Sequence, residues 1–265
     1  MDWLIAYLLL GLFVGFFAGL LGIGGGTLLV PLMVFIFSAQ QLAPDKILHL
    51  ALGTSLASIV FTSLSSIRAH HSREAILWPL VRSAAPALIV GTLAGSFFAD
   101  KLDARYLAAL FVLFAGYSAT HLLLDIKPKA SRSLPNKIGL GLGSALIGIL
   151  SSLVGVGGGV ITIPLMVMCN VQMRNAVGTS AALGLPIAVA GAIGYISTGY
   201  GNSDLPDHTI GYVYIPALIG IVVGTFMTVP FGAKLTHSLP VTTLKKIFAI
   251  ILLGLAVKMF TTIFG

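Results

Sequence analysis

Residues 22–34, GIGGGTLLVPLMV, return later in the chain as GVGGGVITIPLMV at residues 155–167. When each stretch is aligned with the residue before it, 8 of 14 positions are identical, whereas unrelated sequences would share about one. The same spacing of 133 residues separates GTLAGSFFADKL, which begins at Gly91, from GTFMTVPFGAKL, which begins at Gly224. Such self-similarity predicts that the chain consists of two copies of one structural unit.

The composition places both copies in a lipid bilayer. Of the 265 residues, 57% are hydrophobic and only 9% are charged, whereas about a quarter of the residues in soluble domains are charged. The apolar stretches are continuous and do not alternate with polar residues, which favours membrane-spanning helices over strands. We therefore expect an all-α polytopic membrane protein. The net charge of +7 is spread over short loops, which indicates membrane orientation and not nucleic-acid binding.

Ten apolar segments predict the order of the helices. The second and the seventh are too short to cross a bilayer as straight helices, and each follows a glycine run. A basic link, residues 125–137, separates a first transmembrane repeat, residues 1–124, from a second, residues 138–265. Each repeat should hold a glycine-broken helix hairpin plus three transmembrane helices. The segments are 3–21, 27–37, 47–67, 76–99, 106–124, 138–154, 160–171, 176–198, 210–232 and 247–264.

Loop charges predict how the two repeats are oriented. Basic loops remain on the cytoplasmic side, which places the link 125–137 inside together with loops 68–75 and 233–246. Loop 100–105, which has no net charge, and the acidic loop 199–209 then fall outside. In each repeat the hairpin returns to its starting side and three helices cross the membrane, which makes an odd number of crossings. The second repeat should therefore be inverted relative to the first, as in many secondary transporters.

The glycine runs are candidate anion sites. Consecutive glycines end a helix, and a break at membrane depth is tolerated where the backbone lines a cavity. The helix that begins after the break presents unpaired N–H groups and a partly positive dipole end, which suit an anion. The alternative is that small residues only permit close helix packing, as the four-residue spacing of Gly11, Gly15 and Gly19 suggests.

Two GTS motifs and one arginine supply further candidates. Thr54 and Ser55, with Thr179 and Ser180, place hydroxyls inside spans; they could bind an oxyanion or bond back to a carbonyl of their own helix. An arginine within a span, Arg82, could bind an anion or extend its side chain to the membrane surface.

No catalytic or metal-binding pattern appears in the sequence. The chain has one cysteine, Cys169, and neither a phosphate-binding loop nor a zinc-binding histidine motif. The methionines and histidines show no ligand spacing. We therefore expect a protein that is not an enzyme and that has no cofactor and no metal site.

The twin GxGGGxxxxPLMV segments, the GTS pair and the basic link resemble the sulfite exporter TauE/SafE-like family of membrane permeases. The resemblance covers nearly the whole chain and implies transport of sulfite, sulfoacetate or another organosulfonate across the cell inner (plasma) membrane. Thr27 has Val160 as its counterpart, so the two half-sites differ. By position, the substrate-binding residues implied are Gly24, Gly25, Gly26, Thr54, Ser55, Gly157, Gly158, Gly159, Thr179 and Ser180, to which the residue pattern adds Thr27 and Arg82.

These observations predict a secondary transporter that exports a small sulfur-containing anion by alternating access, with the anion held between two opposed half-helix N-termini. Two alternatives stay open: a proton- or sodium-coupled uptake permease for an organic or inorganic anion, and a passive anion channel. The expected partners are the oxyanion substrate and the lipid bilayer, and a homodimer is one assembly compatible with the sequence.

Overall fold

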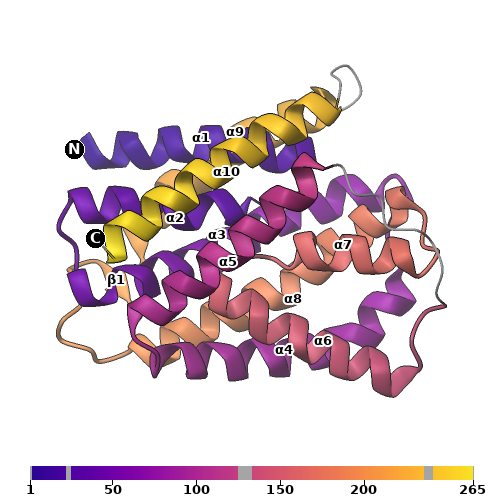
Figure 1. The fold of residues 1–265 in the computed structure, drawn as a ribbon, viewed down its shortest axis with the longest axis horizontal. Helices are drawn as coiled ribbons and strands as arrows, with labels where there is room; N and C mark the ends of the chain where they lie inside the picture. The colour runs from indigo at the N-terminus through magenta and orange to yellow at the C-terminus, as the bar shows by residue number, and fades with distance from the viewer. Residues whose placement is uncertain (1, 22–24, 125–132, 236–240, 265) are drawn as a thin grey trace.

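A computed structural model shows a bundle of long helices that run roughly along one axis (Figure 1). It describes residues 2–21, 25–124, 133–235 and 241–264. Each of the ten predicted apolar segments contributes a helix. The elements are α1 (Asp2–Leu21), α2 (Gly26–Ala39), a short 3-10 turn η1 (Pro44–Lys46), α3 (Ile47–His71), α4 (Trp78–Asp100), α5 (Ala104–Leu123), α6 (Lys137–Val154), α7 (Gly159–Met168), α8 (Met173–Gly199), β1 (Thr209–Ile210), β2 (Val213–Tyr214), α9 (Ile215–Leu235) and α10 (Val241–Phe264).

Two helix starts differ from the sequence prediction by several residues: α10 begins at Val241 and not at 247, and the ninth helix begins later than predicted. The segment predicted as a helix over 210–232 starts as an antiparallel hairpin, in which Thr209 pairs with Tyr214 and Ile210 with Val213. β-Branched and aromatic residues favour extended backbone, and Gly211 supplies the positive φ of 54° at the turn. The helix α9 therefore begins only at Ile215.

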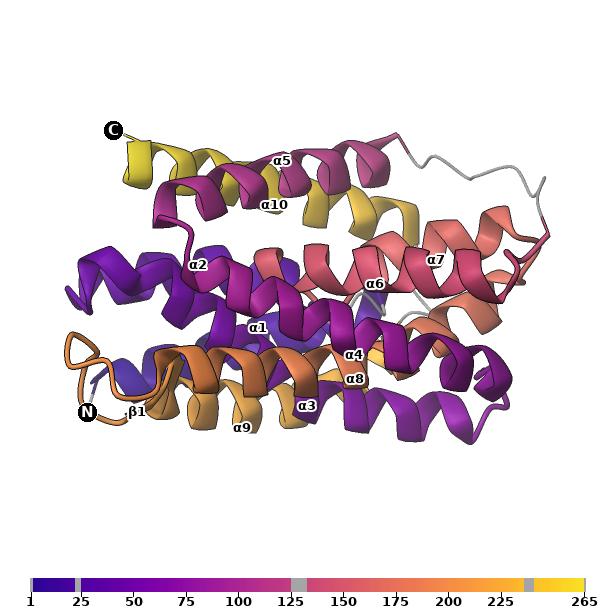
Figure 2. The same cartoon turned by 90° about the horizontal axis from the view of Figure 1, so that it is seen from below.

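The two halves of the chain interleave. The first helix of each half packs on a helix of the other half: α1 lies along α9, and α6 lies along α4. The central pair is α3 and α8, while α5 and α10 pack together at the side of the bundle (Figure 2). Helix α1 begins at the left end of the bundle in Figure 1, whereas α6 begins at the right end. The halves are therefore parts of one unit and not separate domains.

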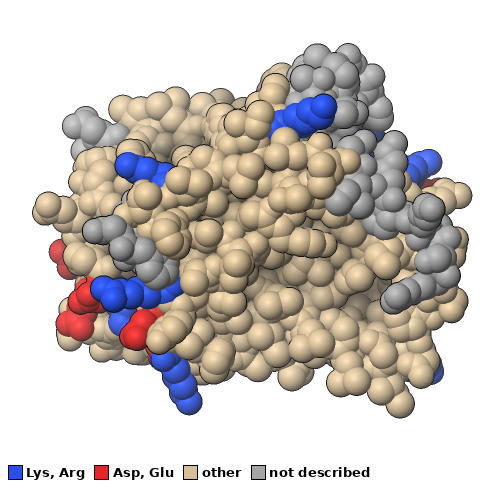
Figure 3. Space-filling view, in the orientation of Figure 1, with Lys and Arg blue, Asp and Glu red and all other residues tan. Residues whose placement is uncertain are grey.

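Many large hydrophobic side chains are exposed on the outside of the bundle. Six helices in the described part of the chain are long and apolar enough to cross a membrane, and α2 and α7 are shorter apolar helices. Large hydrophobic side chains are exposed on α1, α4, α5, α6, α9 and α10. In Figure 3 acidic side chains gather at the left end, and the middle of this face is formed by uncharged residues. Such an exposed apolar belt matches a lipid environment.

Contacts between loops connect residues at each end of the bundle. The Tyr212 hydroxyl, at the turn between β1 and β2, donates to Asp100 Oδ1 at the end of α4 at 2.8 Å. Burial, and next the bond to Asp100, raises the pKa of Tyr212 to about 12, so this phenol keeps its proton at neutral pH. Arg174 donates to the Arg73 carbonyl in loop 68–75, which is predicted to be cytoplasmic.

Small residues allow the interleaved helices to approach closely. A Cβ atom on Gly15 would lie 2.6 Å from Thr225 Cα, and one on Gly91 would overlap the backbone of Ala145. The close-packing alternative is therefore correct for Gly11 and Gly15, because backbone of α9 occupies the space beside both.

Gly91→Val should lower the melting temperature of the purified protein, because its side chain would force α4 and α6 apart. Overpacking of this kind costs about 1–3 kcal/mol. Gly116→Val in α5 is the matched control, since a Cβ at Gly116 meets nothing within 4 Å. Equal melting temperatures for the two variants would show that the α4–α6 contact is not as tight as described.

Candidate functional site

The two glycine runs start two short helices in the same way. Gly25 precedes α2 with φ 70°, and Gly158 precedes α7 with φ 77°. Both values lie in the left-handed region that favours glycine. The first intrahelical bonds also match: the amide of Leu28 donates to the Gly25 carbonyl at 3.1 Å, and that of Ile161 donates to the Gly158 carbonyl at 3.0 Å. The amides before these bonds are left for other partners.

The tip of α2 lies against the second glycine run. A Cβ on Gly26 would lie 2.7 Å from the carbonyl oxygen of Gly155, and that oxygen also accepts a bond of 2.8 Å from Ser55 Oγ. Residues far apart in sequence, from both halves of the chain, therefore meet at this point. Gly24, which was also predicted to belong to the site, lies outside the described residues.

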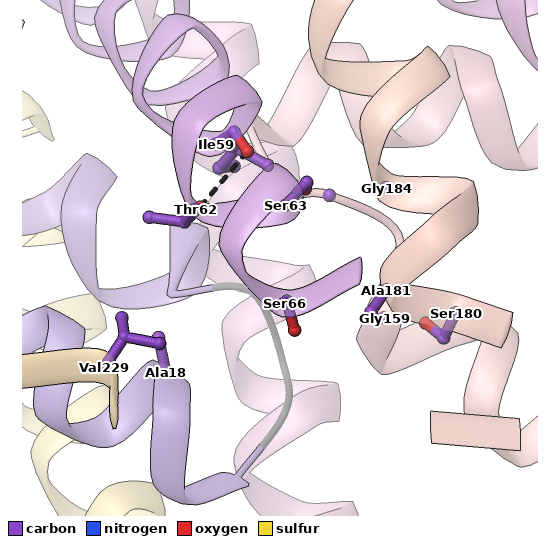
Figure 4. Close-up of a pocket in the computed structure, with 11 residues that line it drawn as sticks. Ala18, Ile59, Thr62, Ser63, Ser66, Gly159, Ser180, Ala181, Gly184 and Val229 are labelled. Atoms are coloured by element: carbon purple, nitrogen blue, oxygen red, sulfur yellow. Dashed lines mark hydrogen bonds between the residues drawn. The ribbon is translucent and has the colours of Figure 1, made fainter. Parts of the chain in front are cut away.

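A cavity of about 30 Å³ lies beside the tip of α7 (Figure 4). It has room for roughly one or two water molecules. Its walls come from both halves: the end of α1, the C-terminal part of α3, the second glycine run, α8 and α9. The lining residues are Ala18, Ile59, Thr62, Ser63, Ser66, Gly157, Gly159, Ser180, Ala181, Gly184 and Val229.

The electrostatic character of this cavity comes from neutral groups. None of the eleven described lining residues is acidic, basic or a histidine. What remains is hydroxyl oxygens, glycine backbone and the N-terminal end of α7, whose dipole is partly positive. No cluster of potential metal ligands occurs among the described residues. This chemistry suits an anion better than a cation.

The threonines of the two GTS motifs cap other helices. Thr54 Oγ1 accepts a bond of 3.0 Å from the amide of Tyr214, the residue before α9. Thr179 Oγ1 accepts a bond of 2.9 Å from the amide of Leu77, the residue before α4. Each helix then has proline as its second residue. The equivalent threonines therefore make equivalent bonds, and neither lines the cavity.

Thr54→Val should therefore lower thermal stability more than substrate affinity. The change removes the acceptor for the Tyr214 amide, and an unsatisfied buried donor costs about 1–3 kcal/mol. Melting temperature and the apparent substrate constant should be measured on the same preparation, with Thr179→Val as the equivalent variant. A large rise in the substrate constant at unchanged melting temperature would restore Thr54 as a ligand.

Of the other residues predicted to bind substrate, one lines the cavity and two lie elsewhere in the bundle. Ser180 lines the cavity and its hydroxyl lies 2.7 Å from that of Thr162 in α7. Thr27 is buried in the first turn of α2, and its hydroxyl has no partner in the described structure. Arg82 is exposed on α4 and is not part of the cavity wall, which favours the alternative that its side chain reaches the membrane surface.

The sequence analysis missed the contribution of α3. Thr62, Ser63 and Ser66 lie in its C-terminal half and face the cavity (Figure 4). The signal that could have identified them is the hydroxyl-rich run TSLSS, residues 62–66, which continues the helix that starts before Thr54. Hydroxyls at a spacing of three or four residues fall on one helix face.

The fold and the site together define a multi-pass membrane protein with a polar, uncharged cavity between its two halves. The sequence profile described as Sulfite exporter TauE/SafE matches residues 7–259, and the chain belongs to this family of membrane transporters. It is a transporter and not an enzyme.

Curated relatives agree with this class. A "Probable membrane transporter protein" of Haemophilus influenzae is 37% identical over 255 residues, which cover 96% of each chain. The "Probable membrane transporter protein YdhB" of Bacillus subtilis is 32% identical over 253 residues, which cover 89% of this chain and 90% of the relative. No solved structure matches the chain.

Proposed function

We propose that the protein is a secondary transporter that exports a small sulfur-containing anion, such as sulfite, sulfoacetate or another organosulfonate, from the cell. The observation that carries the proposal is the tip of α7, which begins at a left-handed glycine and opens into a cavity lined by both halves of the chain. The family description supports the choice of sulfur. The membrane concerned would be the cell inner membrane.

The proposed site uses the amide groups of the glycine runs. Gly157, Gly158 and Gly159 would approach the substrate directly, because they carry no side chains. Ser180 would donate a hydroxyl from α8. The tip of α2, at Gly25, would supply a second positive helix end from the opposite half. Thr27 would make the two half-sites unequal, and that inequality would suit a substrate with one charged and one organic end.

Alternating access is supported by the matched halves. Equivalent caps at Thr54 and Thr179, and equivalent helix starts at Gly25 and Gly158, recur in the two halves. The helices α1 and α6 begin at opposite ends of the bundle (Figure 1). Both facts fit two inverted repeats, residues 1–124 and 138–265, joined by a cytoplasmic link at 125–137. Because the cavity is lined by both halves, rocking of one half against the other would open it to one side of the membrane at a time.

Export is favoured over uptake by the membrane potential. An inside-negative potential drives an anion outward by about 2.3 kcal/mol per charge for each 100 mV. No carboxylate for proton or sodium coupling lines the cavity in the described part of the chain. An uptake permease would need such coupling, whereas an exporter can work without it.

The test is transport by the purified protein in liposomes. External unlabelled sulfite or methanesulfonate should drive the exit of the same labelled anion, and the flux should saturate. Linear, non-saturable flux with large electrical currents would identify a channel instead. Transport that requires a proton or sodium gradient would identify an uptake permease, and absence of flux for every sulfur anion would refute the proposal.

A further inference from the structure

The Ser63 hydroxyl lines the cavity and has no hydrogen-bond partner among the described residues. Its side chain is 6% exposed. Its neighbours in α3 differ: Ser58 donates to the Thr54 carbonyl at 2.8 Å, and Thr62 donates to the Ile59 carbonyl at 3.1 Å. Because polar groups in proteins normally have partners, the Ser63 hydroxyl is available to a molecule that enters the cavity.

The position of Ser63 indicates where such a molecule would bind. A Cβ on Gly184 would lie 3.2 Å from Ser63 Oγ and 3.2 Å from the carbonyl oxygen of Gly157. Ser63 and the second glycine run therefore approach the same point on α8. Ser63 and Gly184 are both labelled in Figure 4. A group bound above Gly184 would be within reach of the Ser63 hydroxyl, which can donate a hydrogen bond, and would also meet the Gly157 carbonyl oxygen, which can only accept one.

The charge of the cavity limits what that group can be. The described cavity wall offers the hydroxyls of Thr62, Ser63, Ser66 and Ser180 and glycine backbone, but no cationic side chain. The cost of removing an ion from water rises with the square of its charge, so a dianion costs about four times as much as a monoanion of equal size. Neutral donors compensate one charge more readily than two.

We propose that Ser63 is a ligand of the transported anion and that the site selects singly charged oxyanions, namely sulfonates and hydrogen sulfite, over doubly charged ones. This inference rests on the proposed transport function and narrows it. Sulfoacetate, which carries a carboxylate besides its sulfonate, should be transported less well than methanesulfonate.

The charge selection is tested with the full chain in liposomes at a fixed membrane potential. Methanesulfonate, which is singly charged at all relevant pH values, should be transported equally at mildly acidic and mildly alkaline pH. Sulfite flux should fall about tenfold per pH unit above its second pKa, as hydrogen sulfite loses its proton. Sulfate should neither be transported nor compete. Sulfate flux equal to that of methanesulfonate would overturn the selection while leaving anion transport intact.

The role of Ser63 is tested in the same assay. Ser63→Ala should raise the apparent constant for methanesulfonate about tenfold or more, because a hydrogen bond to a charged group is lost, and Ser63→Thr should restore much of the affinity. Ser58→Ala is the matched control, because Ser58 is buried in the same helix but lies outside the cavity. Wild-type affinity in Ser63→Ala would refute the ligand role, whereas absence of flux in the wild type would refute the transport function itself.

Discussion

Gly158→Val should abolish anion transport while leaving the protein inserted in the membrane. The backbone of Gly158 has φ 77°, a conformation in which a β-branched residue is strongly strained. A Cβ there would also lie 2.8 Å from Ile187 Cδ1. To relieve both conflicts, the tip of α7 must move, and its free amides would leave the cavity. Saturable flux should be measured beside the yield of detergent-extracted protein.

A second variant separates the effect of backbone strain from the loss of the anion site. Gly201, in the loop after α8, also has a left-handed φ of 79°, but a Cβ there meets nothing within 4 Å. Gly201→Val therefore carries a similar backbone penalty away from the cavity and should keep its flux. If Gly158→Val retained the flux of Gly201→Val, the assignment of the α7 tip to the site would be wrong.

Gly184→Leu should block transport through a different mechanism. Gly184 lies inside the helix α8 and lines the cavity, so a side chain is compatible with its backbone. A leucine side chain at Gly184 would enter the cavity and occupy the space between Ser63 and the glycine run. Flux should fall to the background of empty liposomes. Gly184→Ala should give an intermediate loss, because its one methyl group lies at 3.2 Å from two neighbours.

Gly141→Leu is the matched control for this prediction. Gly141 is also helical, in α6, and a Cβ there meets nothing within 4 Å. Its variant should transport normally. Wild-type flux in Gly184→Leu, at equal protein yield, would mean that the anion passes elsewhere in the bundle.

The helix breaks and helix starts could be predicted from the sequence because each depends on a few consecutive residues. A run of glycines breaks a helix wherever it occurs, so the starts of α2 and α7 follow from the repeated motif. The ten helices follow from apolar length alone. The hairpin at 209–214 was missed because its two strands of two residues each interrupt an apolar run only briefly.

The cavity wall could not be predicted in the same way. Helix α3 is buried over most of its length, so the hydroxyl-rich run at 62–66 does not by itself indicate whether its residues face a cavity or a neighbouring helix. The GTS motifs were recognised as equivalent, but the role of Thr54 depends on Tyr214, 160 residues away. A bond over such a distance in sequence is defined only by the folded structure.

The central claim is that the anion binds at the tip of α7, between the two halves. The most direct measurement is a crystal structure with bromomethanesulfonate, a monoanion whose bromine scatters anomalously. The account predicts a single anomalous peak above Gly184, with the sulfonate oxygens within hydrogen-bond distance of Ser63 Oγ and the Gly159 amide. A peak on the outer surface near Arg82, with the cavity unchanged, would contradict it.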